Sequence, residues 1–214
     1  MLPTYARRLP DRIAPIWHTA ALVALVVLVA LVGTLAKSAA APASRISAVY
    51  VPAILVQCGL VYYVSRAFRP RWVLRDLVGT AKPADVLVAL ALATVVIGAE
   101  IAFAHPSATA LAILPRTGAE RLVWLLVAAS VGFAEEVVYR GYFIVQLRAF
   151  TGSTVVAIAL QALLFAIAHA NQGAFAMVRF GAYALLFGAV AVWRRSLVPA
   201  ILCHVGIDAI GAFH

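Results

Sequence analysis

The sequence predicts an all-α fold, a polytopic bundle of about seven or eight transmembrane helices. Hydrophobic residues make up 65% of the chain and charged residues only 12%, and the mean hydropathy is +1.02. Soluble domains carry about twice that share of charged residues, roughly 25%. The apolar residues also gather in runs of about 20, the length of a membrane-spanning helix. We therefore expect one integral membrane domain over residues 1–214.

Seven apolar runs are the expected spans, and the fourth is unusually long. At about 29 residues it would measure about 43 Å as an α-helix, more than a bilayer core, so it should tilt or bend. Residues 66–82 mix arginines with aliphatic residues and predict a short helix at the headgroups. The predicted spans cover residues 17–36, 47–65, 84–104, 121–149, 153–170, 174–193 and 197–213.

The basic residues predict orientation rather than a nucleic-acid partner. With the N-terminus inside, 12 of the 17 Lys and Arg residues fall on the cytoplasmic side and 5 on the other, as the positive-inside rule requires. No run of five basic residues occurs, so no nucleic-acid partner is expected. We expect a multi-pass protein of a bacterial-type cell membrane, with a cytoplasmic N-terminus and the lipid bilayer as its surroundings. Cys58 and Cys203 suggest neither a disulfide framework nor a cysteine-rich metal site.

Polar side chains at membrane depth are the informative residues of this sequence. Charge there costs a few kcal/mol, so such groups usually face the protein interior and pair with one another. Each span-embedded group is therefore a candidate for a common site. The group consists of Glu100, Glu135, Glu136, Arg140, His169, His204 and Asp208.

The spacing of the two adjacent glutamates predicts different roles for them. Glu136 and Arg140 are four residues apart, so on an α-helix they share a face and are expected to form an ion pair that supports the site. Glu135 lies about 100° further round the helix and points away from that pair. A carboxylate without its own cation in an apolar surrounding suits a general base.

The histidines are expected near these glutamates, although the position of His204 along its span does not match theirs. From the turn near residues 150–152, Glu135 and His169 come out at roughly 22 and 25 Å along their spans, and thus level. His204 and Asp208 repeat the four-residue spacing. His204 comes out only roughly 13 Å along its span, so the last span must tilt or begin elsewhere.

Three short motifs carry a family resemblance. The segments "EEVVYR" (from Glu135), "FAIAH" (ending at His169) and "HVGID" (from His204) resemble the EExxxR, FxxxH and HxxxN/D motifs of the CPBP intramembrane proteases. That family includes the type II CAAX prenyl proteases and bacterial relatives labelled abortive-infection or bacteriocin-processing proteins. All three motifs occur in family order, within a protease motif region at about 121–213.

The resemblance implies a CAAX prenyl protease-like intramembrane endopeptidase. Its substrate would be a membrane-associated peptide or protein, prenylated and CAAX-like or bearing a leader or tail. Carried over by motif, Glu135 and His169 would activate a water molecule, and His204 and Asp208 would stabilise the oxyanion. The family often has Asn where this chain has Asp208. An ionised Asp donates no hydrogen bond, so it is expected to orient His204 or to be protonated.

The resemblance also implies supporting roles for Glu136 and Arg140, and it leaves the metal question open. No cofactor is favoured, because the sequence lacks HExxH. Zinc held by Glu135, His169 and His204, with water as the fourth ligand, is the alternative. Two other functions compete with the protease. One is a non-enzymatic membrane scaffold or immunity protein, and the other is a proton or ion pathway that includes Glu100.

Overall fold

The computed structural model describes residues 13–35, 44–66, 78–103 and 108–213, and within these ranges every regular element is helical. The all-α fold class is thereby confirmed. The elements in chain order are α1 (Ile16–Leu35), η3 (Ile46–Tyr50), α2 (Val51–Arg66), α4 (Pro83–Phe103), α5 (Ala108–Ile113), α6 (Gly118–Glu135), η4 (Glu136–Phe143), α7 (Ile144–Thr151), α8 (Thr154–Ala168), η5 (Ala170–Gln172), α9 (Ala174–Arg194), α10 (Val198–Ile210) and η6 (Gly211–Phe213).

Five helical stretches are long and apolar enough to cross a membrane. They are Ile16–Thr34, Ile46–Arg66, Pro83–Phe103, Gly118–Thr151 and Ala174–Arg194. The other two predicted spans correspond to shorter apolar helices, Thr154–Ala168 and Val198–Phe213. All seven predicted runs are thus helical, whereas seven or eight crossings stay a prediction. The short α5 was not predicted, and most of the expected headgroup helix at 66–82 lies outside the described residues.

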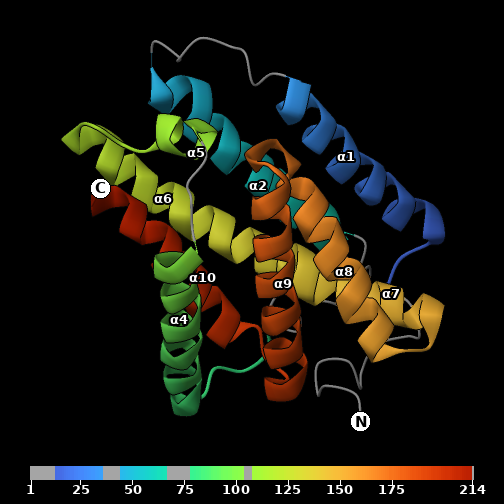
Figure 1. Cartoon of the computed structure of the whole chain (residues 1–214). Coiled ribbons are helices and arrows are strands. Elements are labelled where there is room, and N and C mark those ends of the chain that lie inside the picture. The colour runs from blue at the N-terminus through green and yellow to red at the C-terminus, as the bar shows by residue number, and fades with distance from the viewer. Residues whose placement is uncertain (1–12, 36–43, 67–77, 104–107, 214) are drawn as a thin grey trace.

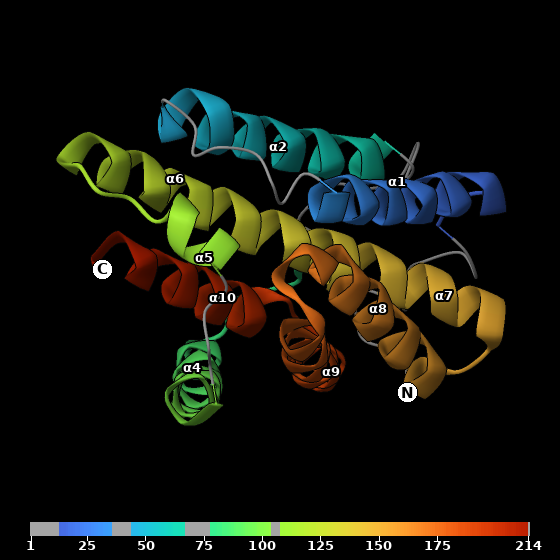
Figure 2. The same cartoon turned by 45° about the horizontal axis from the view of Figure 1, so that its top comes forward.

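One long rod organises the molecule. Helix α6, segment η4 and helix α7 continue into one another, and α10 runs beside α6 (Figure 1). Helix α2 contacts α6 from the opposite side, and α1 lies near α2 and contacts α8 and η5 (Figure 2). Helices α4 and α9 pack against α10 and α8. The middle of the rod is therefore covered on both sides by other helices.

Local sequence signals set the two ends of this rod. Thr117 caps α6, and Glu120 completes the capping box by accepting from the backbone of Thr117. At the other end Gly152 adopts a left-handed conformation with φ 71°, which glycine tolerates without strain. Ser153 then caps α8 through the backbone N–H of Val156. The helical hairpin therefore turns at the predicted place.

The close approach of α10 to α6 resolves the conflict over the depth of His204. A Cβ added to Gly132 of α6 would lie 2.8 Å from the backbone nitrogen of Val205, so only glycine permits this contact. Helix α10 follows the slanting course of α6, and both run obliquely to α4 and α9 (Figure 1). The last apolar helix is therefore tilted, and its tilt brings His204 to the middle of the rod.

Candidate active site

The "EEVVYR" motif lies where the rod changes from an α-helix to a π-helix. Residues Glu136–Phe143 are π-helical and all buried. The α-helical expectation for this segment was therefore wrong, although the expected ion pair forms. Arg140 Nη1 lies 3.2 Å from Glu136 Oε1, and the two side chains are 1% and 0% exposed. π-helical turns are rare and occur frequently at functional sites.

Arg140 is held by aromatic rings as well as by its carboxylate. Its guanidinium carbon lies 4.4 Å from the ring centroid of Phe165 and 5.5 Å from that of Phe187. Such cation–π contacts stabilise a cation that has left water. These contacts are consistent with the supporting role that was predicted for Arg140.

The imidazole of His204 is surrounded by three carboxylates. Its Nδ1 lies 2.9 Å from Glu136 Oε1, while its Nε2 lies 3.8 Å from Glu135 Oε2 and 3.6 Å from Asp208 Oδ2. The spacing of the motif predicted that Glu136 pairs with Arg140 and that Glu135 points away from that pair. Both glutamates instead reach one ring, because the tight contact of α10 with α6 inserts His204 between them. His204 Nδ1 donates its short hydrogen bond to Glu136 rather than to Asp208.

His169 is oriented by the phenylalanine that precedes it in its motif. The Nδ1 atom of His169 lies 2.8 Å from the carbonyl oxygen of Phe165. A carbonyl only accepts, so Nδ1 carries a hydrogen and a neutral ring keeps Nε2 as an acceptor. The rings of Phe165 and Phe180 flank the imidazole at centroid distances of 4.6 and 4.3 Å. The four-residue spacing thus fixes both the tautomer and the plane of His169.

The three motifs meet at a common cavity. This interior cavity has a volume of about 320 Å³, and the polar groups lining it include Glu100, Glu135, Arg140, His169, His204 and Asp208. One oxygen of Glu135, Oε2, is buried and has no hydrogen-bond partner within the described part of the chain. The Glu135 side chain is nevertheless 16% exposed, so a cavity of this size and polarity can hold water beside its carboxylate. All four residues predicted to be catalytic are therefore brought together.

A second cavity shares Glu135 and His169 with the first as lining residues. It is a groove of about 600 Å³ between α1 and α2, and we call it the α1–α2 groove. Its walls are mostly aliphatic, with Leu22 and Val26 from α1 and Leu60 from α2. Glu135 and His169 line both cavities. Gln57 of α2 also lines the groove, and sequence reasoning missed it because no motif surrounds it.

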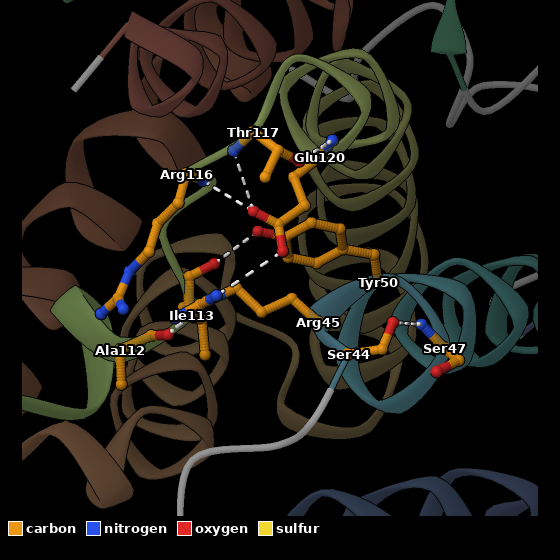
Figure 3. A network of polar contacts seen from close by, with 9 residues as sticks. All are labelled: Ser44, Arg45, Ser47, Tyr50, Ala112, Ile113, Arg116, Thr117 and Glu120. Carbon is orange, nitrogen blue, oxygen red and sulfur yellow. Dashed lines mark hydrogen bonds and ion pairs between the residues drawn. The ribbon is translucent and has the colours of Figure 1, made fainter.

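A polar network lies near the start of α6 (Figure 3), and two of its residues, Tyr50 and Ile113, also line the interior cavity. Glu120, which caps α6, pairs with Arg45 at 3.5 Å, and the Tyr50 hydroxyl donates to the carbonyl of Ile113 at 2.7 Å. The Tyr50 ring also contacts Trp124 with a centroid distance of 5.5 Å, and both rings line the cavity. The network therefore joins the start of α2 to the segment that precedes α6.

Glu100, the extra carboxylate of the sequence analysis, has partners of its own. Arg179 Nη1 lies 3.0 Å from Glu100 Oε2, and the Tyr183 hydroxyl donates to Oε1 at 2.8 Å. These contacts join α4 to α9 beside the interior cavity. Both partners lie on α9, four residues apart, and neither was predicted to belong to the site.

Metal binding has no dedicated cluster within the described ranges. No group of three or more His, Cys, Asp or Glu side chains there is arranged to hold a metal ion. The ring nitrogens His169 Nδ1 and His204 Nδ1 are engaged by Phe165 and Glu136. A zinc ion would therefore have to use the Nε2 atoms together with Glu135.

The chain is a multi-pass integral membrane protein, and its carboxylates and histidines gather around an interior cavity. These are side chains of the kind that general acid–base catalysis uses. Residues 117–210 match the family model described as Rce1-like, type II CAAX prenyl endopeptidase. The match runs from the cap of α6 to the end of α10, so it includes all three motifs. The comparisons with curated proteins and with solved structures find no match.

The family match confirms the resemblance that the motifs predicted: residues 117–210 are similar to the CAAX-processing proteases of membranes. The matched segment is a little under half of the 214 residues. It leaves α1, α2 and α4 outside. The match assigns no role to the individual site residues.

Proposed function

We propose that this protein is an intramembrane endopeptidase that hydrolyses a peptide bond of a membrane-associated substrate. The observation that carries the proposal is the position of Glu135 and His169, which line both the interior cavity and the α1–α2 groove. A chain that passes from one cavity to the other must pass these two side chains. They also carry the two acceptors best suited to holding a water molecule.

The water would be activated between Glu135 and His169. The partly exposed carboxylate of Glu135 lines the interior cavity, and His169 Nε2 is an acceptor because Nδ1 donates to Phe165. Each acceptor can take one of the two hydrogens of water, which leaves an oxygen lone pair for the substrate carbonyl. Glu135 then takes a proton as the new C–O bond forms, and it later returns that proton to the leaving amine.

The developing oxyanion would be stabilised by His204. Its Nδ1 is held by Glu136, and its Nε2 faces the interior cavity beside Glu135 and Asp208. A hydrogen on Nε2 can be donated to the tetrahedral intermediate, which supplies stabilisation where negative charge forms. The carboxylate of Asp208 lies 3.6 Å from His204 Nε2 and therefore stabilises a hydrogen on that nitrogen. Arg140 in turn pairs with Glu136 and keeps it in place.

The reaction is proposed to use protein groups alone, with zinc as the competing version. Glu135, His169 and His204 would be the zinc ligands in that case, with water as the fourth. The glutamic version is preferred because Glu135 and His169 already offer a base and an acceptor for one water. For the substrate, we propose a peptide whose end is anchored in the bilayer, prenylated and CAAX-like or bearing a leader or tail. We also retain the proposal of a bacterial-type cell membrane and a cytoplasmic N-terminus.

The experiment is a cleavage assay in liposomes with a quenched fluorescent peptide that ends in a prenylated CAAX box. Wild-type protein should cleave it, and Glu135→Gln should lower kcat at least about 100-fold while the unfolding temperature stays the same. If Glu135→Gln lowers folding and activity together, a membrane scaffold is favoured. If cleavage is absent and Glu100→Gln abolishes proton flux in the same liposomes, the ion-pathway alternative is favoured.

A further inference from the structure

Gln172 is a polar residue of the interior cavity that neither the motifs nor the proposed mechanism uses. It is the last residue of η5, the short helix that joins α8 to α9. The residue lines the interior cavity and is partly buried. Its side-chain amide makes no hydrogen bond to any residue that the structure describes, and neither end of the amide is enclosed. An amide that can both donate and accept is therefore available at the cavity wall.

The turn that carries Gln172 places it next to His169. The backbone N–H of Gln172 donates to the carbonyl oxygen of His169 at 2.9 Å, which closes a 3₁₀ turn. Side chains three residues apart eclipse one another on such a turn, which rises about 2 Å per residue. The side chains of His169 and Gln172 therefore leave the backbone in the same direction, about 6 Å apart. Both residues line the interior cavity.

The neighbouring Asn171 shows that this direction is specific to Gln172. Successive residues of a 3₁₀ turn are about 120° apart. Asn171 accordingly lies against α1, where a Cβ added to Gly33 would be 3.4 Å from the Asn171 Cβ. Asn171 lines neither the interior cavity nor the α1–α2 groove. Of the two side-chain amides on η5, that of Gln172 is the one beside the site.

The spacing to His169 indicates what Gln172 would meet. In the proposed reaction the water between Glu135 and His169 attacks the substrate carbonyl, so the cleaved bond lies beside His169. An extended peptide advances about 3.3 Å per residue, so about 6 Å corresponds to roughly two residues. Each non-proline residue of a peptide carries one N–H and one C=O. A glutamine amide is complementary to these groups, because its NH₂ donates to the C=O and its oxygen accepts from the N–H.

We propose that Gln172 is a substrate-positioning residue, whose side-chain amide binds the backbone N–H and C=O of a substrate residue about two positions from the cleaved bond. The inference rests on the proposed endopeptidase function. It implies that the enzyme fixes the register of the peptide at His169 through the backbone, without selecting a particular side chain at that position.

Binding can be measured without turnover. In the Glu135→Gln background, the prenylated CAAX peptide should bind about tenfold more weakly when Gln172→Met is added, because a side chain of similar size without the amide replaces it. Asn171→Leu, on the same turn, is the matched control and should leave the Kd unchanged. Equal weakening by Asn171→Leu would overturn the inference, because it would indicate a general disturbance of η5. Absence of any binding by Glu135→Gln alone would overturn both the inference and the proposed function.

A change in the peptide isolates the contact itself. Peptides in which one backbone amide at a time is replaced by an ester lose a single N–H. One of them, changed about two positions from the cleaved bond, should bind the Glu135→Gln protein about tenfold more weakly. The same ester should cost nothing further in Glu135→Gln/Gln172→Met, because its partner is already absent. An equal loss in both proteins would overturn the inference.

A second variant covers a failure of Gln172→Met to fold. Gln172→Ala then takes its place in the same comparison, because truncating a partly exposed side chain leaves no core cavity. The expected weakening and the expected insensitivity to the ester are the same.

Turnover separates this inference from the proposed function. In the otherwise wild-type protein, Gln172→Met should raise KM about tenfold and change kcat much less, since binding of the peptide is affected rather than the chemical step. Cleavage that requires Glu135, with a Kd and a KM that Gln172→Met leaves unchanged, would overturn the inference and leave the endopeptidase standing. Binding that requires Gln172 in a protein without cleavage would overturn only the endopeptidase.

Discussion

His204 Nδ1 lies 2.9 Å from Glu136 Oε1, and this contact joins α10 to the π-helical segment of the rod. The same carboxylate oxygen lies 3.2 Å from Arg140. Glu136 is therefore the residue that connects the arginine to the histidine. The adjacent Glu135 has its closest charged contact at 3.8 Å. The two glutamates should thus differ sharply in what their removal does.

Glu136→Gln should destabilise the fold more than Glu135→Gln. Removing the Glu136 charge leaves Arg140 buried without its partner, which costs about 3–5 kcal/mol. Glu135→Gln should cost less than about 1 kcal/mol, within the range of ordinary substitutions. Thermal unfolding in detergent would measure both. Equal destabilisation by the two variants would contradict the assignment of Glu136 as the structural partner.

The Glu136–Arg140 pair should show strong coupling. Arg140→Met alone leaves an uncompensated carboxylate and should cost about 3–5 kcal/mol, whereas the double variant Glu136→Gln/Arg140→Met should recover part of that loss. The free energies of unfolding of the four proteins form the cycle. Additive losses would mean that the 3.2 Å contact contributes little.

Gly132→Ala should weaken the site by separating α6 from α10. The added Cβ would meet the Cγ2 and backbone nitrogen of Val205, each at 2.8 Å, so the helices must move apart. Overpacking of this kind costs about 1–3 kcal/mol, and cleavage should fall because His204 moves with α10. Gly98→Ala in α4 is the control, since nothing lies within 4 Å of its added Cβ. A Gly132→Ala protein with full activity would show that the close contact is dispensable.

Asp208→Asn should retain activity within about tenfold of wild type, because Glu136 already holds His204 and an amide can donate to the oxyanion. Asp208→Leu removes both the charge and the donor and should lower kcat about 100-fold. The measurement is kcat for the quenched peptide, with unfolding temperatures as the check on folding. A loss with Asn as severe as the loss with Leu would indicate that the charge itself is required.

Cleavage should persist after exhaustive chelation. The proposed reaction uses Glu135 and His169 with water, so removal of metal should leave kcat unchanged. Metal content measured on the same sample shows that the treatment worked. Activity that disappears on chelation and returns with zinc would replace the glutamic mechanism by the version in which Glu135, His169 and His204 are ligands.

Spacing within one helix was sufficient to predict the local contacts. The four-residue separation of Glu136 and Arg140 correctly predicted their ion pair, and the composition correctly predicted an all-helical membrane protein. The turn at residues 150–152 followed from Gly152 and Ser153. These features depend on residues near one another in the chain, so a single sequence contains them.

Contacts between helices could not be predicted from the sequence. The bond from His204 to Glu136 depends on the tilt of α10, which follows from packing at Gly132 rather than from any residue near His204. Gln57 has no motif around it, and it gains its place only because α2 packs on α6. The π-helical turn was missed as well, because apolar periodicity is counted on an α-helical repeat.

That π-helical turn makes the length of the rod as important as its composition. A π-helix closes its hydrogen bonds over five residues instead of four, so residues 136–143 hold more chain than an α-helix of the same rise would accept. Deleting a single residue after Arg140 would let the segment tighten into a regular helix. Every motif residue would survive in the sequence and α7 would keep its place, yet Glu136 and Arg140 would lose the wide turn on which they now lie. The spacing of the motifs along the chain is in this sense a part of the site.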